Sequence, residues 1–235
     1  MENKKIKVCI TGAAGNIAYS LIPMIASGQM FGPRTLVHLT MLDLPNMEYA
    51  LKGIAMELED GAYPLLYAIE YGSDPKQMFA ECDVVIFLGG ASRQPGQERR
   101  DLLQINGKIF REQGQALNEV GKDTCKCLVV ANPCNTNCYI LSKNCPKIPK
   151  KNFTALCRLD HNRAQNQVRI PENSFIYMSQ VAMKLGVDPC KIKKVIVWGN
   201  HSALQYPDLT QAELDGKRVE EVWFKRKGRN VLAHK

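Results

Sequence analysis

The chain has 235 residues, 45% of them hydrophobic, and a formal net charge of +8. This length and composition allow one large buried core or two smaller ones. No apolar run approaches the roughly 20 residues that span a bilayer, which argues against a membrane protein. The amino end enters an apolar, strand-like run within a few residues, so we expect no signal or transit peptide.

The positive charge is concentrated at the carboxyl end. From residue 217 onward the chain carries seven Lys or Arg and two Glu, which is a surplus of five out of the total of +8. A nucleic-acid-binding surface is one interpretation, but this tail contains no recognisable binding motif. We therefore expect a solvated, partly disordered end and no nucleic-acid partner.

The nine cysteines are an odd number, and several lie in apolar stretches, as Cys9 and Cys127 do. This usage is typical of reduced thiols in a cytosolic protein, so we expect a cytoplasmic location. Cys125 and Cys127, with Cys134 and Cys138 nearby, could suggest a metal site. Paired C-x-x-C motifs are absent, however, and Cys125 and Cys127 are expected on one face of a strand, so we predict no metal.

A turn of small residues joins the first expected strand to the first expected helix. Residues 6–10 are apolar, and Gly12, Gly15 and Ala18 then follow in a G-x-x-G-x-x-A pattern. Small residues at these positions allow the backbone to approach a pyrophosphate at a helix N-terminus. Any tight strand-to-helix turn can use glycines, so this pattern needs a second observation.

Asp43 provides that second observation. A helix is expected over residues 16–28, and the next apolar run, residues 36–42, ends at Asp43. The dinucleotide-binding fingerprint places at this point an acid that binds the adenosine ribose hydroxyls, and its charge would repel a 2′-phosphate. The alternative is a residue that only caps the loop before Pro45. The pattern favours NAD over NADP.

Strands and helices alternate through the middle of the chain, as in a parallel sheet with crossover helices. The expected elements are a helix over 47–60, strands over 68–71 and 83–88, a long helix that ends near 121, and a strand over 127–131. The sequence therefore predicts a Rossmann-type, doubly wound α/β sheet, followed by a second, incomplete α/β domain.

The loop over residues 89–100 contains glycines, a proline and three arginines. This composition suits a mobile lid that brings charge to a substrate, and the alternative is a solvated loop. Ligands of such sheets bind outside the carboxyl ends of the strands. Because Asn132 and Pro133 end a further strand, an amide is expected in the same crevice, which favours the lid.

Asp160 and Arg163 lie one helical turn apart, and His201 follows an apolar run. A histidine that moves a proton needs a carboxylate to fix its tautomer, and an arginine can hold a substrate carboxylate by two hydrogen bonds. Positions i and i+3 share one face of a helix. Taken singly, these residues could form a surface ion pair and a loop histidine, but the upstream cofactor loop favours an active site.

Seven segments, in chain order, resemble the cytosolic-type malate dehydrogenases of the lactate/malate dehydrogenase superfamily. They are TGAAGNIAYSL, LDLP, MELEDGAYPLL, ERRDLLQINGKIF, ANPCNTNC, LDHNRA and WGNHSALQYPD, and they span most of residues 6–208. The resemblance implies a cytoplasmic homodimer of the tricarboxylic acid cycle and malate metabolism. Its reaction would pass a hydride between C2 of malate and NAD, giving oxaloacetate and NADH.

The resemblance also implies a role for each site residue. His201 would be the general base for malate oxidation, with Asp160 as its orienting partner. Three arginines would bind the substrate: Arg93 at the distal carboxylate, Arg99 at the reacting oxygen and Arg163 at the C1 carboxylate. Asn132 would contact both the substrate and the cofactor. The cofactor site would comprise Gly12, Gly15, Asn16, Ile17, Asp43 and Asn132, with Asn16 where the family usually has glutamine.

Two features depart from the family pattern. Residues 168–180 resemble an insertion, and Pro171 should break a helix that is continuous in the family. Only 34 residues follow His201, so the second domain is expected to be incomplete. We thus expect an NAD-binding domain over 1–154 and a truncated substrate domain over 155–235. The alternative function is an impaired isoform or fragment that retains a dinucleotide-binding domain and acts by binding.

Overall fold

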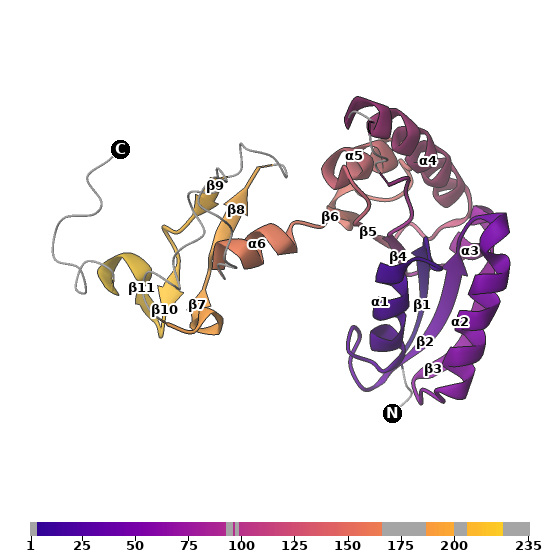
Figure 1. Ribbon diagram of the computed structural model, residues 1–235, viewed down its shortest axis with the longest axis horizontal. Coiled ribbons are helices and arrows are strands. Elements are labelled where there is room, and N and C mark those ends of the chain that lie inside the picture. Colours follow the sequence, from indigo (N-terminus) through magenta and orange to yellow (C-terminus); the bar gives the residue numbers. More distant parts are fainter. Residues whose placement is uncertain (1–3, 93–95, 97–98, 166–186, 200–205, 223–235) are drawn as a thin grey trace. The chain divides into compact units, whose positions relative to one another are not determined.

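The computed structural model describes residues 4–92, 96, 99–165, 187–199 and 206–222 (Figure 1). The chain divides into two compact units, Met1–Leu156 (unit 1) and Cys157–Lys235 (unit 2). The segment 168–180, including Pro171, and the basic tail beyond residue 222 lie outside the described residues. No helix in the described part is both long enough and apolar enough to cross a membrane.

Unit 1 contains a six-stranded sheet in the order β3-β2-β1-β4-β5-β6, and every neighbouring pair is parallel. The strands are β1 (Lys4–Thr11), β2 (Thr35–Leu42), β3 (Leu66–Gly72), β4 (Val84–Phe87), β5 (Lys126–Val129) and β6 (Phe153–Ala155). The chain runs outward from β1 to β3 and then returns to the other side of β1 at β4. This reversal is that of a Rossmann fold, so the predicted fold is confirmed.

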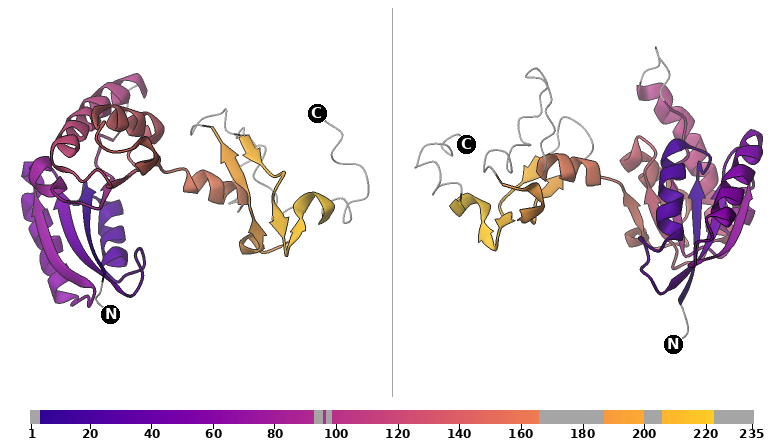
Figure 2. Two further views of the ribbon diagram at one scale, coloured as in Figure 1. Left: turned by 180° about the vertical axis from the view of Figure 1, so that it is seen from behind. Right: turned by 60° about the horizontal axis from the view of Figure 1, so that its bottom comes forward.

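Helices cover both faces of the sheet (Figure 2). They are α1 (Asn16–Ala26), α2 (Glu48–Asp60), α3 (Pro75–Phe79), α4 (Arg99–Val120) and α5 (Cys134–Asn144), with short 3-10 turns η1 (Pro45–Met47) and η2 (Lys150–Asn152). The buried residues of α1 and α2 join one core cluster, and those of α3, α4 and α5 join the other.

Strand β1 shows why helices must pack on both faces of the sheet. Ile6, Val8 and Ile10 enter the core under α1 and α2, whereas Cys9 enters the core under α3 to α5. Successive side chains of a strand point to opposite faces, so a central parallel strand with both faces buried is apolar at almost every position. Helix α1 was expected to reach residue 28 but ends at Ala26, because Gly28 turns the chain with φ of +84°.

The cysteines of unit 1 are mostly structural. Cys125 and Cys127 were expected on one face of a strand, but only Cys127 belongs to β5 and Cys125 directly precedes it; both enter the same core cluster, and all nine cysteines of the chain are free. Burial raises the pKa of Cys9 well above its ordinary value and that of Cys145 to about 11. Such thiols stay protonated and behave as small apolar side chains. Within the described residues, no group of three His, Cys, Asp or Glu could hold a metal ion.

Unit 2 is a small α/β unit with short strands. The described part of it contains α6 (Arg158–Gln165), η3 (Pro189–Lys191), β7 (Ile192–Lys193), β8 (Ile196–Trp198), β9 (Tyr206–Asp208), β10 (Glu213–Leu214) and β11 (Lys217–Arg218). Strands β11, β10 and β7 form one antiparallel sheet, and β8 pairs with β9. Among the described residues of this unit, the buried core consists of Ile192, Val195, Ala212, Leu214 and Val219.

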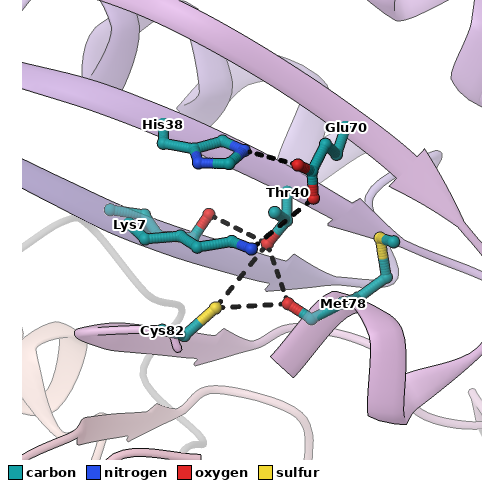
Figure 3. A network of polar contacts seen from close by, with 7 residues as sticks. Lys7, His38, Thr40, Glu70, Met78 and Cys82 are labelled. Atoms are coloured by element: carbon teal, nitrogen blue, oxygen red, sulfur yellow. Dashed lines mark hydrogen bonds and ion pairs between the residues drawn. The ribbon is translucent and has the colours of Figure 1, made fainter. Parts of the chain in front are cut away.

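A charged network lies midway along β1, β2 and β3 (Figure 3). Glu70 Oε2 lies 3.5 Å from Lys7 Nζ, and Glu70 Oε1 lies 3.1 Å from His38 Nε2. The His38 side chain is only 16% exposed. Burial therefore lowers the pKa of His38 below its ordinary value, even though the Glu70 carboxylate acts in the opposite direction. His38 is thus neutral in the folded protein near neutral pH.

We expect His38→Gln to reduce the pH dependence of stability. Because the pKa of His38 is lowered, the unfolded chain binds a proton more readily than the folded chain does at this site. The free energy of unfolding should therefore fall as the pH drops through the ordinary histidine range, and the variant should lack this contribution. Urea unfolding at about pH 8 and about pH 5.5 measures the difference.

The matched control is Tyr67→Phe, which keeps His38 and the ring that packs edge-on against it at 5.8 Å. It should retain the pH dependence of the parent chain. An equal loss of stability on acidification in His38→Gln and in the parent chain would show that His38 does not contribute.

Candidate functional site

The loops that leave β1 and β4 touch backbone to backbone. Gly12 has φ of +66°, and a Cβ built on it would lie 2.5 Å from Gly89 Cα and 2.7 Å from Gly89 N. The Gly89 N–H donates a hydrogen bond to Thr11 Oγ1 at 3.1 Å. These loops meet where the strand order reverses, which is the position at which doubly wound sheets bind their ligands. Any side chain at residue 12 would push the two loops apart.

Helix α1 begins directly after this contact. The Gly15 N–H donates to Gly12 O at 3.0 Å, and no side chain caps the helix at Gly15. The first turn contains no acidic residue. Amide hydrogens in the first turn of a helix have no partner within the helix and attract anions. The side chains of Asn16 and Ile17, which open the helix, are exposed, and Ile17 is 65% exposed.

Asp43 follows β2 and connects it to the same glycine loop. Its Oδ2 accepts the N–H of Ala14 at 2.9 Å, and its Oδ1 accepts the N–H of Leu44 at 2.8 Å. The bond to Leu44 is the local cap of the loop before Pro45 that the sequence offered as an alternative role for Asp43. The bond to Ala14 is a long-range contact that the sequence did not predict. A carboxylate has about four lone-pair sites, so roughly two remain for ribose hydroxyls. These contacts fit an adenosine ribose beside the loop.

Asn132 lies in the turn that follows β5, and its side chain is exposed. Its carbonyl oxygen accepts a hydrogen bond at 2.8 Å from Asn106 Nδ2 of α4. Asn106 is fully buried, and sequence reasoning did not select it. The available signal was its spacing, because Asn106, Phe110 and Leu117 follow one helical stripe and all three are buried. A polar residue on such a stripe must find hydrogen-bond partners.

The remaining site residues are placed only in part. Arg93 and His201 lie outside the described residues. Arg99 is the first residue of α4 and Arg163 belongs to α6, but their side chains also lie outside the described part. Asp160 is half-buried on α6 in unit 2. The assembly of these five residues into one site therefore stays a prediction.

The sequence matches one protein family along most of its length. Residues 6–154 match the lactate/malate dehydrogenase NAD binding domain, and residues 157–231 match the alpha/beta C-terminal domain of the same family. The chain belongs to the lactate/malate dehydrogenase family. Its six-stranded sheet is the family's NAD-binding domain, and a shorter C-terminal α/β domain follows it.

Named relatives support this membership. The chain is 47% identical over 220 residues to the malate dehydrogenase of Protochlamydia amoebophila (strain UWE25), a match that covers 94% of this chain and 63% of that protein. The malate dehydrogenase structure from Naegleria fowleri has a TM-score of 0.83 at 38% identity, covering 97% of this chain and 67% of that one. The structure of Trichomonas vaginalis lactate dehydrogenase in complex with NADH and oxamate has a TM-score of 0.79 at 39% identity. This match covers 92% of this chain and 62% of that one.

We expect Gly12→Ala to weaken both folding and cofactor binding. A Cβ at this position would meet the Gly89 backbone at 2.5 Å in a left-handed conformation. The free energy of unfolding should fall by roughly 1–3 kcal/mol. NADH should bind at least about tenfold more weakly, which corresponds to about 1.4 kcal/mol. Urea unfolding and a fluorescence titration with NADH measure the two effects.

Gly53→Ala is the control for this substitution. Gly53 is exposed in α2, and a Cβ built on it would meet nothing within 4 Å. Alanine should raise the free energy of unfolding by roughly 0.5–1 kcal/mol at such a position and leave NADH binding unchanged. Binding of NADH by Gly12→Ala with the parent affinity would refute the role assigned to the loop.

We expect Asp43→Asn to reduce the preference for NADH over NADPH. The substitution keeps a side chain of the same size and removes the charge that would repel a 2′-phosphate. The ratio of the two dissociation constants should shift toward NADPH by about tenfold or more. Asp74→Asn is the control, since the Asp74 side chain also accepts a backbone N–H, that of Lys76 at 2.9 Å, but it caps the N-terminus of α3 and does not follow β2. An equal shift in both variants would contradict a specific role for Asp43.

Proposed function

We propose that the chain is an NAD-dependent malate dehydrogenase, which transfers a hydride between malate and NAD to give oxaloacetate and NADH. The observation that carries this proposal is the joined glycine loops at the point where the strand order reverses, within a domain of the lactate/malate dehydrogenase family. The 47% identity to a malate dehydrogenase supports the choice of substrate.

The residues of unit 1 fit a dinucleotide. Gly12 and Gly15 keep the loop narrow, the first turn of α1 from Asn16 and Ile17 offers amide hydrogens to the pyrophosphate, and Asp43 offers lone pairs to the ribose. When bound, NAD supplies the nicotinamide ring that accepts the hydride from C2 of malate. Asn132, in the turn that follows β5, would contact the cofactor and the substrate.

The acid–base chemistry is assigned to His201 and Asp160. His201 would take the proton from the C2 hydroxyl of malate during oxidation and return it during reduction of oxaloacetate. Asp160 would accept a hydrogen bond from the other ring nitrogen, which fixes the tautomer and stabilises the charged imidazole.

Three arginines are assigned to the charges of a dicarboxylic acid. Arg163 would hold the C1 carboxylate, Arg99 would polarise the reacting oxygen, and Arg93 would hold the distal carboxylate. Lactate dehydrogenases also occur among similar structures, so the substrate must be decided by the site. A monocarboxylic acid would leave the Arg93 guanidinium without a partner, which favours malate over lactate.

We also propose a cytoplasmic homodimer in which α2 lies at the subunit contact. Tyr49 on α2 is 90% exposed and Met56 is 59% exposed. Large apolar side chains that stand in solvent on one helix are typical of a contact surface. The domain limits of 1–154 and 155–235, with an insertion at 168–180, stay part of this proposal.

A second candidate follows from the length of the match. The chain spans about 63% of the length of its Protochlamydia relative, whereas its NAD-binding domain contains all six strands of the sheet. A chain that binds the dinucleotide without turnover is therefore the alternative. It predicts NADH binding with no NADH oxidation.

The test is NADH oxidation by the full chain with oxaloacetate, and with pyruvate in parallel. We expect turnover with oxaloacetate and at least about 100-fold lower kcat/KM with pyruvate. His201→Asn should lower kcat by about 100-fold or more and leave NADH binding unchanged, because it removes the proton acceptor alone. The control is His161→Asn, which makes the same substitution at the residue next to Asp160 and should leave turnover unchanged.

Each outcome separates the candidates. NADH binding without turnover in the parent chain would support the binding protein. Absence of NADH binding would contradict both candidates. Pyruvate reduced as fast as oxaloacetate would contradict the assignment of malate while leaving a dehydrogenase.

A further inference from the structure

A groove lies between helix α5 and the edge strand β6, which are in contact in unit 1 (Figure 1). Helix α5 contributes Cys138, Tyr139, Ser142 and Lys143, whose spacing of three and four residues places their side chains on one side of the helix. The groove has a volume of about 320 Å³. This value is at the lower end of the range for small-molecule sites, so a ligand of the groove is expected to be small.

The floor of the groove is apolar. Strand β6 contributes Phe153 and Ala155, which are two positions apart and therefore lie on the same face of the strand. Both are half-buried and, together with Cys138, pack against the core under α3 to α5. The ring of Tyr139 is 61% exposed and reaches solvent. A flat apolar group in the groove would therefore meet an apolar floor and an aromatic ring beside it.

Two lysines give the groove a positive charge. Lys143 of α5 and Lys150 of η2 are both exposed, and the Nζ of Lys143 lies 5.4 Å from the centroid of the Tyr139 ring. Among the described residues of unit 1, the ion pairs involve neither lysine. An anion that binds between the two ammonium groups would therefore not have to displace a carboxylate.

The surrounding sequence adds to this positive charge. Residues 124–159, which include β5, α5, η2 and β6, contain no Asp or Glu. The same range contains six basic residues, namely Lys126, Lys143, Lys147, Lys150, Lys151 and Arg158. A surface with one sign of charge raises the local concentration of ions of the opposite sign. This edge of the sheet should therefore attract anions.

The groove is separate from the glycine loops. Strand β6 is the third strand from β1 in the order β1-β4-β5-β6. Neighbouring strands lie about 4.8 Å apart, so β6 is roughly 14 Å from the strand that leads to Gly12. A small ligand in the groove would not reach the loop at Gly12 that is assigned to the dinucleotide.

We propose that this groove binds a small aromatic carboxylate, with the ring on the apolar floor and the carboxylate between Lys143 and Lys150. Aromatic rings pack favourably against Phe153 and Tyr139 in offset or edge-on arrangements. An inorganic anion would leave the apolar floor uncovered, and a neutral ring would leave the two ammonium groups without a partner. The site goes beyond the proposed malate dehydrogenase function and does not depend on it.

The test is a titration of the full chain with benzoate, followed through the backbone amide signals in NMR spectra. The amides of Tyr139, Ser142 and Phe153 should shift with one dissociation constant on the order of 1 mM, as expected for a ligand of this size. Benzamide has the same shape without the charge, and inorganic phosphate has charge without the ring. Each should bind at least about tenfold more weakly than benzoate.

Substitution of the two lysines tests the contact with the carboxylate. Either Lys143→Gln or Lys150→Gln should weaken benzoate binding by about two- to fivefold, because exposed charges contribute modestly, and the double variant by about fivefold or more. The matched control is Lys126→Gln combined with Lys151→Gln. It removes the same charge from the same segment at two exposed residues that do not line the groove, and it should leave benzoate binding unchanged.

Several results would overturn the proposal. One is the absence of shifts at the three amides up to about 20 mM benzoate, well above the expected dissociation constant. Equal binding of benzamide would assign no role to the lysines, and equal binding of phosphate would show a cationic patch without a site for a ring. An equal loss of benzoate binding in the two double variants would show a general effect of net charge.

Discussion

The backbone contact between Gly12 and Gly89 is the constraint on which the candidate site depends. It brings the first loop of the sheet against the loop after β4 at a distance that admits no side chain, with a Cβ on Gly12 falling 2.5 Å from Gly89 Cα. Asp43, which follows β2, binds the first loop by accepting the N–H of Ala14. Asn106 of α4 binds the second loop by accepting the N–H of Ala91. Three consecutive loops of the sheet are thus positioned by backbone contacts and two polar side chains.

The sequence predicted the parts of the fold that depend on local pattern. Apolar runs predicted β1 and β2, and small residues predicted the turn at Gly12 and Gly15. The boundaries were less accurate where tertiary contacts set them. Strand β3 begins at Leu66, ahead of the expected residue 68, because the pairing with β2 includes a shift in register near Val37. Such a shift depends on the partner strand and leaves no periodic signal.

The residues of the candidate site also divide into those that a local pattern predicts and those that depend on tertiary contacts. Asp43 could be found from its place after the second strand, but its bond to Ala14 spans 29 positions and requires the alignment of β1 with β2. Asn106 matches no motif, and its partners lie 15 and 26 positions away in the sequence. Motifs identify residues that meet a ligand. The residues that hold them in place are found from buried polar groups and from the partners that these groups require.

The network of Lys7, His38 and Glu70 has a separate consequence. Lys7 and His38 lie four residues, or roughly 13 Å, from the last residues of β1 and β2, and Glu70 lies two residues from the last residue of β3. The pH-dependent contribution of His38 to stability therefore arises away from the glycine loops that would meet a ligand. Substitutions in the network can adapt the protein to another acidity or temperature at little risk to its chemistry. The middle of the sheet and its carboxyl edge are thus open to independent evolutionary change.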